Sequence, residues 1–177
     1  MNTEDSKKSS INHSEREKRL LERQAAKLFL QCYGQLTGQR HGSIVHNDPL
    51  QPDISTSLAG TSLDLEIAHL YGSAAEAMLL LGKELSDDTY QALRSLEQTD
   101  PDHRLLQALQ RILHAKAGKL YQSKRVWLVL RNANPLWQRQ DFLDHLPLLQ
   151  LPEQHPFEQI WVVADMHGIS GLVALYP

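Results

Sequence analysis

Two continuous apolar runs of strand length place the strongest constraint on the fold of this chain. They cover residues 126–130 (Val-Trp-Leu-Val-Leu) and 160–164 (Ile-Trp-Val-Val-Ala). A strand with one face in water alternates apolar and polar residues, whereas an unbroken apolar run is typical of a strand covered on both faces. We therefore expect both runs to be central strands of a sheet that carries other structure on each face.

A helix and three strands are predicted before the first run. Ser14 and Glu17 have the capping-box spacing that begins a helix, which we expect to end near Gly38. Its apolar stripe is predicted to consist of Leu21, Ala25, Leu28, Cys32 and Leu36. Three strands are expected at 43–46, 53–58 and 62–68, with the last two joined as a hairpin through 59–61.

The middle of the chain, from about 73 to 121, is predicted to be helical. Asp100-Pro101 gives a start signal for the later helix, whose buried stripe is expected to contain Leu105, Leu109, Ile112 and Leu113. A short edge strand is expected at 172–176. The resulting order predicts an α/β protein with a mixed central sheet flanked by helices.

The length of 177 residues predicts a single domain over 13–177, preceded by a polar, disordered leader over 1–12. No apolar segment approaches about 20 residues, and the first residues lack a secretory pattern, so we expect a cytoplasmic protein without a membrane partner. The single cysteine, Cys32, lies on a predicted helix face and is interpreted as a packing residue.

Charge is distributed unevenly along the chain. The net charge is −3, but residues 103–140 contain no Asp or Glu and eight Lys or Arg residues. Such a segment can form a positive surface for phosphates, or it can be a solvated helix face with partners elsewhere in the chain. The candidate nucleic-acid contacts within it are Arg104, Arg111, Lys119, Lys124 and Arg131.

The sharpest local feature is the pair Pro52-Asp53, followed by Glu66 in the third predicted strand. If Asp53 begins one strand of the hairpin and Glu66 lies in the next, their carboxylates can converge on one side of the sheet. Two carboxylates and a backbone carbonyl can hold Mg²⁺, which prefers oxygen ligands, and leave positions open for water and a phosphate oxygen.

With Pro52-Asp53, Glu66 and this order of elements, residues 14–132 resemble the PD-(D/E)XK nuclease-like superfamily. The segment is also similar to bacterial families of this size in which Pro-Asp precedes a Gly-x-Glu-like strand. The resemblance implies a restriction-endonuclease-like core of helix, three strands, helix and strand. It further implies Mg²⁺, or Mn²⁺ as a substitute, at Asp53, Glu66 and Ile67, and hydrolysis of DNA or RNA phosphodiesters.

The sequence departs from that pattern at Ala68, where the superfamily usually has a lysine that positions or activates water. A nuclease must then recruit another lysine. Lys116 is the leading candidate, at the edge of an apolar stripe, while Lys83 and Lys119 are weaker ones. Alternatively Lys116 is a surface lysine. The chain would then be a catalytically inactive nuclease-fold protein that acts as a binding or interaction module, or an unrelated small α/β adaptor or structural subunit.

Several other residues are further candidates for the site or for contact with a partner. Asp64 is either an accessory ligand or a capping or exposed acid, and Glu22 is either a site acid or a solvated helix residue. His69 is an alternative proton carrier, since its ordinary pKa lies near neutrality. Trp137 is the one tryptophan considered for contact with a base or a partner. Residues 167–171 are predicted to form a turn.

Overall fold

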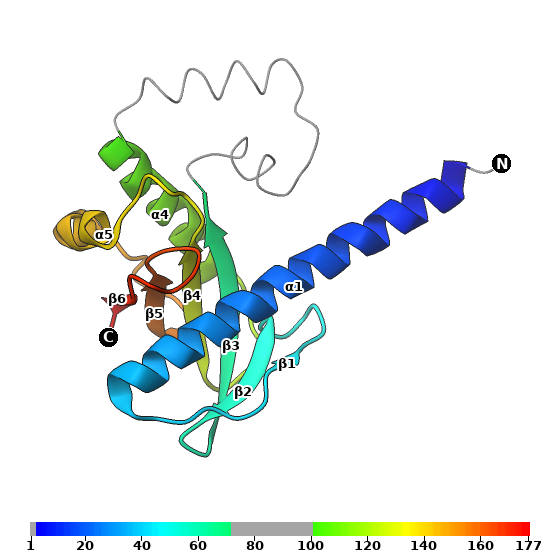
Figure 1. Ribbon diagram of the computed structural model, residues 1–177, viewed down its shortest axis with the longest axis horizontal. Coiled ribbons are helices and arrows are strands. Elements are labelled where there is room, and N and C mark those ends of the chain that lie inside the picture. Colours follow the sequence, from blue (N-terminus) through cyan, green and yellow to red (C-terminus); the bar gives the residue numbers. More distant parts are fainter. Residues whose placement is uncertain (1–2, 72–100) are drawn as a thin grey trace.

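The computed structural model describes residues 3–71 and 101–177, with side chains described over 13–71 and 104–177 (Figure 1). Lys83 and the helix expected over 73–100 therefore lie outside the described residues. The described elements are α1 (Thr3–Thr37), β1 (Val45–His46), β2 (Ile54–Leu58), β3 (Thr61–Leu70), α4 (Pro101–Ala117), β4 (Val126–Asn132), α5 (Arg139–His145), a 3₁₀ turn (Leu146–Leu148), β5 (Phe157–Val163) and β6 (Leu172–Tyr176).

The six strands form one mixed sheet in the order β1-β2-β3-β4-β5-β6. Strands β1, β2 and β3 pair antiparallel, β3, β4 and β5 pair parallel, and β6 pairs antiparallel with β5. The prediction of an α/β fold with a mixed sheet is confirmed, and β6 is an edge strand as expected.

The sheet carries helices on both faces (Figure 1). Helix α1 packs on one face, where its apolar side chains join those of β2, β3 and β4. Helices α4 and α5 cover the other face, where their apolar side chains pack against alternate residues of β4, β5 and β6. All seven residues of β4 are consequently buried. In the second apolar run all residues are buried except Trp161, which is partly buried, so the two-sided covering predicted from both runs is confirmed.

The predicted buried stripe of α1 was confirmed at Ala25 and wrong at Leu36, which is exposed, while Leu21, Leu28 and Cys32 are partly buried. The stripe is rotated, because the buried apolar residues of the helix are Ala25, Ala26, Phe29, Leu30 and Tyr33. The cause is an aromatic cluster, in which the Tyr33 ring lies 5.2 Å from Trp127 and 5.5 Å from Trp161. Large rings bury more apolar area than the predicted leucines, so they decide which side of the helix faces the sheet.

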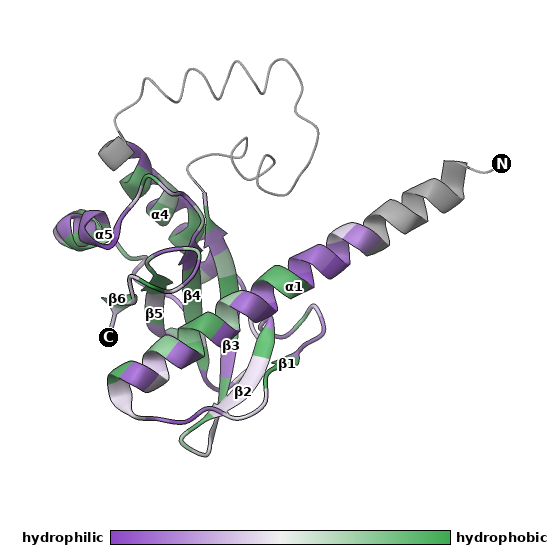
Figure 2. Cartoon of the chain, viewed as in Figure 1, coloured by the Kyte–Doolittle hydropathy of each residue, from purple (hydrophilic) through white to green (hydrophobic). Residues whose placement is uncertain are grey.

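Helix α1 begins at Thr3 rather than at Ser14. Ser14 lies inside the helix, where side-chain contacts four residues apart join His13 to Glu17 and Arg19 to Glu15. These contacts favour helix across the position of the predicted cap. The N-terminal part of α1 extends beyond the sheet (Figure 1), and over the residues coloured in Figure 2 the helix becomes apolar where it crosses the strands.

Helix α4 is described from Pro101 to Ala117 and buries Leu105, Leu109 and Leu113 of the predicted stripe. Strand β3 is longer than predicted and runs past the start of β2, because the pairing between them begins at Ile54 opposite Leu65. Among the described strands, only β4 therefore pairs with residues 66–70 of β3. None of the helices in the described part of the chain is both long and apolar enough to cross a bilayer.

Candidate functional site

The candidate site lies at this open edge of β3, where side chains replace the missing strand partner. The Ile67 amide donates a hydrogen bond of 2.9 Å to Oδ2 of Asp53, the residue immediately before β2. The Ile67 carbonyl accepts a hydrogen bond of 3.3 Å from Nζ of Lys116, which reaches across from α4. Both backbone groups of Ile67 are thus satisfied by charged side chains, as buried edge groups require.

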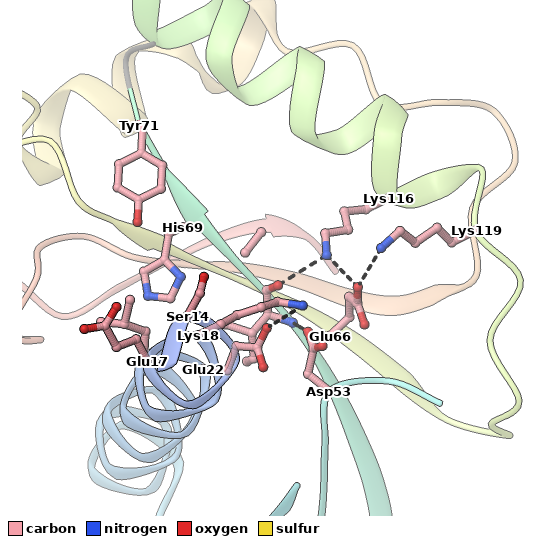
Figure 3. Close-up of a pocket in the computed structure, with 13 residues that line it drawn as sticks. Ser14, Glu17, Lys18, Glu22, Asp53, Glu66, His69, Tyr71, Lys116 and Lys119 are labelled. Atoms are coloured by element: carbon pink, nitrogen blue, oxygen red, sulfur yellow. Dashed lines mark hydrogen bonds and ion pairs between the residues drawn. The ribbon is translucent and has the colours of Figure 1, made fainter. Parts of the chain in front are cut away.

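Glu66 and Lys116 form the closest ion pair of the site (Figure 3). Lys116 Nζ lies 2.6 Å from Oε1 of Glu66, and the two side chains are 18% and 4% exposed. Lys119, one turn further along the chain and 54% exposed, places its Nζ 3.5 Å from the same oxygen. The structure therefore brings together Asp53, Glu66 and Lys116, the three residues predicted to act in catalysis.

Asp53 is held in an environment that disfavours its charge. Burial, followed by the negative charge of Glu66, raises the pKa of Asp53 from 3.8 to about 6, although the Ile67 amide and Lys116 oppose the shift. Two buried carboxylates that repel each other in this way are stabilised by a cation between them.

The donor atoms fit the chemistry of Mg²⁺, since the two carboxylates and the Ile67 carbonyl are all hard oxygen ligands. Lys116 already bonds Glu66 and this carbonyl, so a divalent ion would share these two groups with the ammonium. Within the ranges 13–71 and 104–177, no group of three or more His, Cys, Asp or Glu side chains is arranged to hold a metal ion. The side-chain ligands that the site offers to Mg²⁺ are therefore two, Asp53 and Glu66.

Helix α1 adds a third acid and a lysine to the site. Oε2 of Glu22, a buried side chain, lies 2.7 Å from Nε2 of His46, and its Oε1 lies 3.6 Å from Nζ of Lys18. Burial lowers the pKa of Lys18, but the charges of Glu22 and Asp53 outweigh that effect and raise it above its usual value. Glu22 is thus close to the carboxylate pair but already has two partners.

Two cavities lined by the described residues meet at the carboxylates. The first, of about 340 Å³, extends towards Ser14, Glu17, His69 and Tyr71. The second, of about 310 Å³, extends towards Asn47, Leu50, Leu120 and Tyr121. Both are lined by Lys18, Asp53, Glu66 and Lys119.

His69 lies in the wall of the first cavity, beside the ring of Tyr71 (Figure 3). Burial, and then the positive charges of Arg131 and Lys116, lower the pKa of His69 to about 4. Its Nε2 is buried and has no hydrogen-bond partner among the described residues. At neutral pH this imidazole is uncharged, so the predicted proton carrier would act as a neutral donor or acceptor.

Asp64 is bound away from the site. Its Oδ1 accepts a hydrogen bond from Ser55 and its Oδ2 accepts one from Ser123. It lines neither of the two cavities. The carboxylate two positions before Glu66 therefore joins β3 to its neighbouring segments rather than serving as an accessory ligand.

The predicted nucleic-acid contacts do not lie on one surface. Arg104 and Arg131 are buried, and Arg131 donates from Nε and Nη2 to the Met166 carbonyl. Arg111, Lys119 and Lys124 are exposed. Trp137, predicted to contact a base or a partner, is buried in the cluster between the sheet and helices α4 and α5. Formal charge along a sequence does not distinguish a solvated arginine from one whose stem is buried.

Four residues that sequence patterns did not single out contribute to the site: Lys18, His46, Tyr71 and Tyr121. Burial and the Glu66 carboxylate raise the pKa of Tyr121, whose hydroxyl donates to the Lys116 carbonyl. No local signal marks these residues, because they meet the carboxylates only through the packing of α1, of β1, of the end of β3 and of the segment after α4.

Comparisons of this chain with family models, curated proteins and solved structures found no match. Its function must therefore be inferred from the geometry of its own residues.

Proposed function

We propose that this protein is a Mg²⁺-dependent nuclease that hydrolyses phosphodiester bonds of DNA or RNA on a restriction-endonuclease-like core. The observation that carries the proposal is the position of Lys116, whose Nζ lies 2.6 Å from Glu66 and 3.3 Å from the Ile67 carbonyl, next to Asp53. Lys116 supplies from α4 the ammonium that Ala68 lacks.

The arrangement of the elements supports the same proposal. Helix α1 precedes three antiparallel strands, and α4 precedes β4, which pairs parallel with β3. This order is the one expected from the resemblance to the PD-(D/E)XK superfamily. Fold likeness alone does not establish an activity, so the proposal depends on the side chains at the edge of β3.

The residues of the site have two tasks in the proposed reaction, metal binding and activation of water. Asp53, Glu66 and the Ile67 carbonyl would hold Mg²⁺, which when bound neutralises phosphate charge and lowers the pKa of adjacent water. The Lys116 ammonium would orient the attacking water and stabilise the charge that develops on phosphorus oxygens. The water oxygen bonds to phosphorus, the bond to the leaving oxygen breaks, and that oxygen takes up a proton as the water loses one.

The exposed basic residues would guide the substrate. Lys119 reaches the carboxylates with a side chain that is 54% exposed, and Arg111 and Lys124 are exposed nearby in the chain. Contacts between such side chains and phosphates position a strand without selecting its sequence.

A second candidate function is a binding module that keeps the fold without the reaction. The observation that favours it is that Lys116 already bonds Glu66 and the Ile67 carbonyl, two of the three proposed Mg²⁺ ligands. A salt bridge can satisfy the buried acid in the absence of a metal ion. Nucleic-acid binding by such a module would persist in EDTA.

The proposal predicts metal-dependent cleavage. Purified protein with Mg²⁺ or Mn²⁺ is expected to cut labelled DNA or RNA, and EDTA is expected to stop the reaction, because the carboxylates alone cannot neutralise phosphate charge. Gel electrophoresis of the products measures this directly. If neither metal supports cutting of either nucleic acid, while binding is unchanged in EDTA, the binding module is the correct function.

A further inference from the structure

We infer that the two cavities beside the carboxylates form one groove for a single nucleic-acid strand, with one nucleotide seated on each side of the phosphate at Asp53 and Glu66. This inference rests on the proposed function for the position of the phosphate. The cavities meet only at that point, because Lys18, Asp53, Glu66 and Lys119 line both of them.

The size of the cavities favours single nucleotides. Their volumes, about 340 and 310 Å³, lie at the lower end of the range of about 300–1,000 Å³ for pockets that hold small organic ligands. A duplex keeps its bases paired and stacked, so they cannot enter separate cavities on opposite sides of one phosphate. Bases of a single strand can be splayed apart and bound individually.

The outer end of the second cavity has an apolar rim. It is formed by Leu50, in the loop between β1 and β2, and Leu120, in the loop after α4, which are 71% and 98% exposed. The two loops are joined where the Gln122 amide donates to the Leu50 carbonyl at 3.5 Å. Side chains this exposed contribute little to folding, whereas the face of an unpaired base is an apolar surface that they can cover.

Paired charges and aromatic rings line the groove. Lys18 and Lys119 stand at the junction of the cavities and Arg19 lines the second cavity, where they pair with Glu22, Glu66 and Glu15 in turn. A strand backbone that passes there would compete with these acids for the three basic side chains. The first cavity ends at His69 and Tyr71, whose rings stack with an interplanar angle of 23° and centroids 6.2 Å apart. Basic side chains along the backbone and planar or apolar groups for the bases are the features typical of single-strand sites.

The test is a binding experiment on the full chain with Mg²⁺. Probes are short fluorescent DNA and RNA strands with phosphorothioate linkages that resist hydrolysis, and a DNA duplex of the same sequence. Fluorescence anisotropy is expected to show about tenfold tighter binding of a single strand than of the duplex. The double variant Leu50→Ser with Leu120→Ser is expected to weaken single-strand binding about tenfold and leave duplex binding unchanged.

The matched control carries Leu148→Ser and Ile169→Ser, two exposed aliphatic residues that line neither cavity, and is expected to bind like the wild type. The inference is overturned if the duplex binds as tightly as the strand, or if the Leu50 and Leu120 variant is indistinguishable from this control. Leucine-dependent strand binding without any cleavage would support the groove and refute the nuclease. Cleavage of a duplex at the same rate by the wild type and by the Leu50 and Leu120 variant would support the nuclease and refute the groove.

Discussion

Replacing Lys116 with methionine is expected to lower the rate of Mg²⁺-dependent cleavage by roughly 10²–10³-fold, the effect of losing one charge-stabilising group in an active site. Methionine keeps the apolar stem of lysine and removes only the ammonium. The same substitution leaves Glu66, 4% exposed, with the longer 3.5 Å contact to the exposed Lys119 in place of its 2.6 Å partner. We therefore expect a loss of about 3 kcal/mol in the free energy of unfolding, since a buried charge that loses its close partner is costly.

Single-turnover cleavage and urea denaturation measure these two effects separately, provided that the variant is assayed where circular dichroism shows it folded. Lys119→Met is the matched control. Its ammonium lies 3.5 Å from the same Glu66 oxygen, but its side chain is 54% exposed, so we expect a change below about 1 kcal/mol and less than tenfold in rate. Equal effects of the two substitutions would contradict the role assigned to Lys116.

Replacing Asp53 with asparagine is expected to abolish cleavage and, in metal-free buffer at pH 7.5, to stabilise the fold by roughly 1–3 kcal/mol. Burial and Glu66 raise the pKa of Asp53 from 3.8 to about 6, so the folded protein holds this proton more tightly than the unfolded chain does. Asparagine can still accept the hydrogen bond from the Ile67 amide.

The sign of the pH dependence follows from that shift. Wild-type stability contains an unfavourable contribution from Asp53 that is absent below about pH 4, grows as the pH rises, and is complete above about pH 6. The stabilisation by Asp53→Asn should thus vanish between pH 7.5 and pH 4. Thermal unfolding in EDTA at both pH values measures it. A difference between the two proteins that is the same at both pH values would show that the Asp53 carboxylate is not strained by its neighbours.

The elements that could be predicted from sequence were those in which one local signal agrees with the tertiary structure. The apolar run that begins β4 predicted a fully buried strand, and the apolar spacing within α4 predicted its buried residues Leu105, Leu109 and Leu113. The stripe of α1 was wrong because four aromatic rings, on α1, β4 and β5, determine the orientation of that helix. Such a cluster forms between distant segments and leaves no periodic pattern along one of them.

For the site, the sequence supported the pair Asp53 and Glu66 and the choice of Lys116, because an acid pair at that spacing and a lysine beside an apolar stripe are local features. It could not show that β3 runs past β2, which is what leaves Ile67 open to Asp53 and Lys116. It also could not separate the exposed Lys119 from the buried Arg131. Burial depends on how helices cover the sheet, which charge patterns alone do not determine.

Two acids of β3, Glu66 and Asp64, give the most direct test that this edge is a catalytic site. Glu66 bonds Lys116 and lines both cavities, whereas Asp64 accepts hydrogen bonds from Ser55 and Ser123 and lines neither. The decisive measurement is the rate of Mg²⁺-dependent cleavage by folded Glu66→Gln and Asp64→Asn beside the wild type. We predict that Glu66→Gln is inactive and that Asp64→Asn stays within about tenfold of the wild-type rate. Undiminished cleavage by Glu66→Gln would contradict the proposed site.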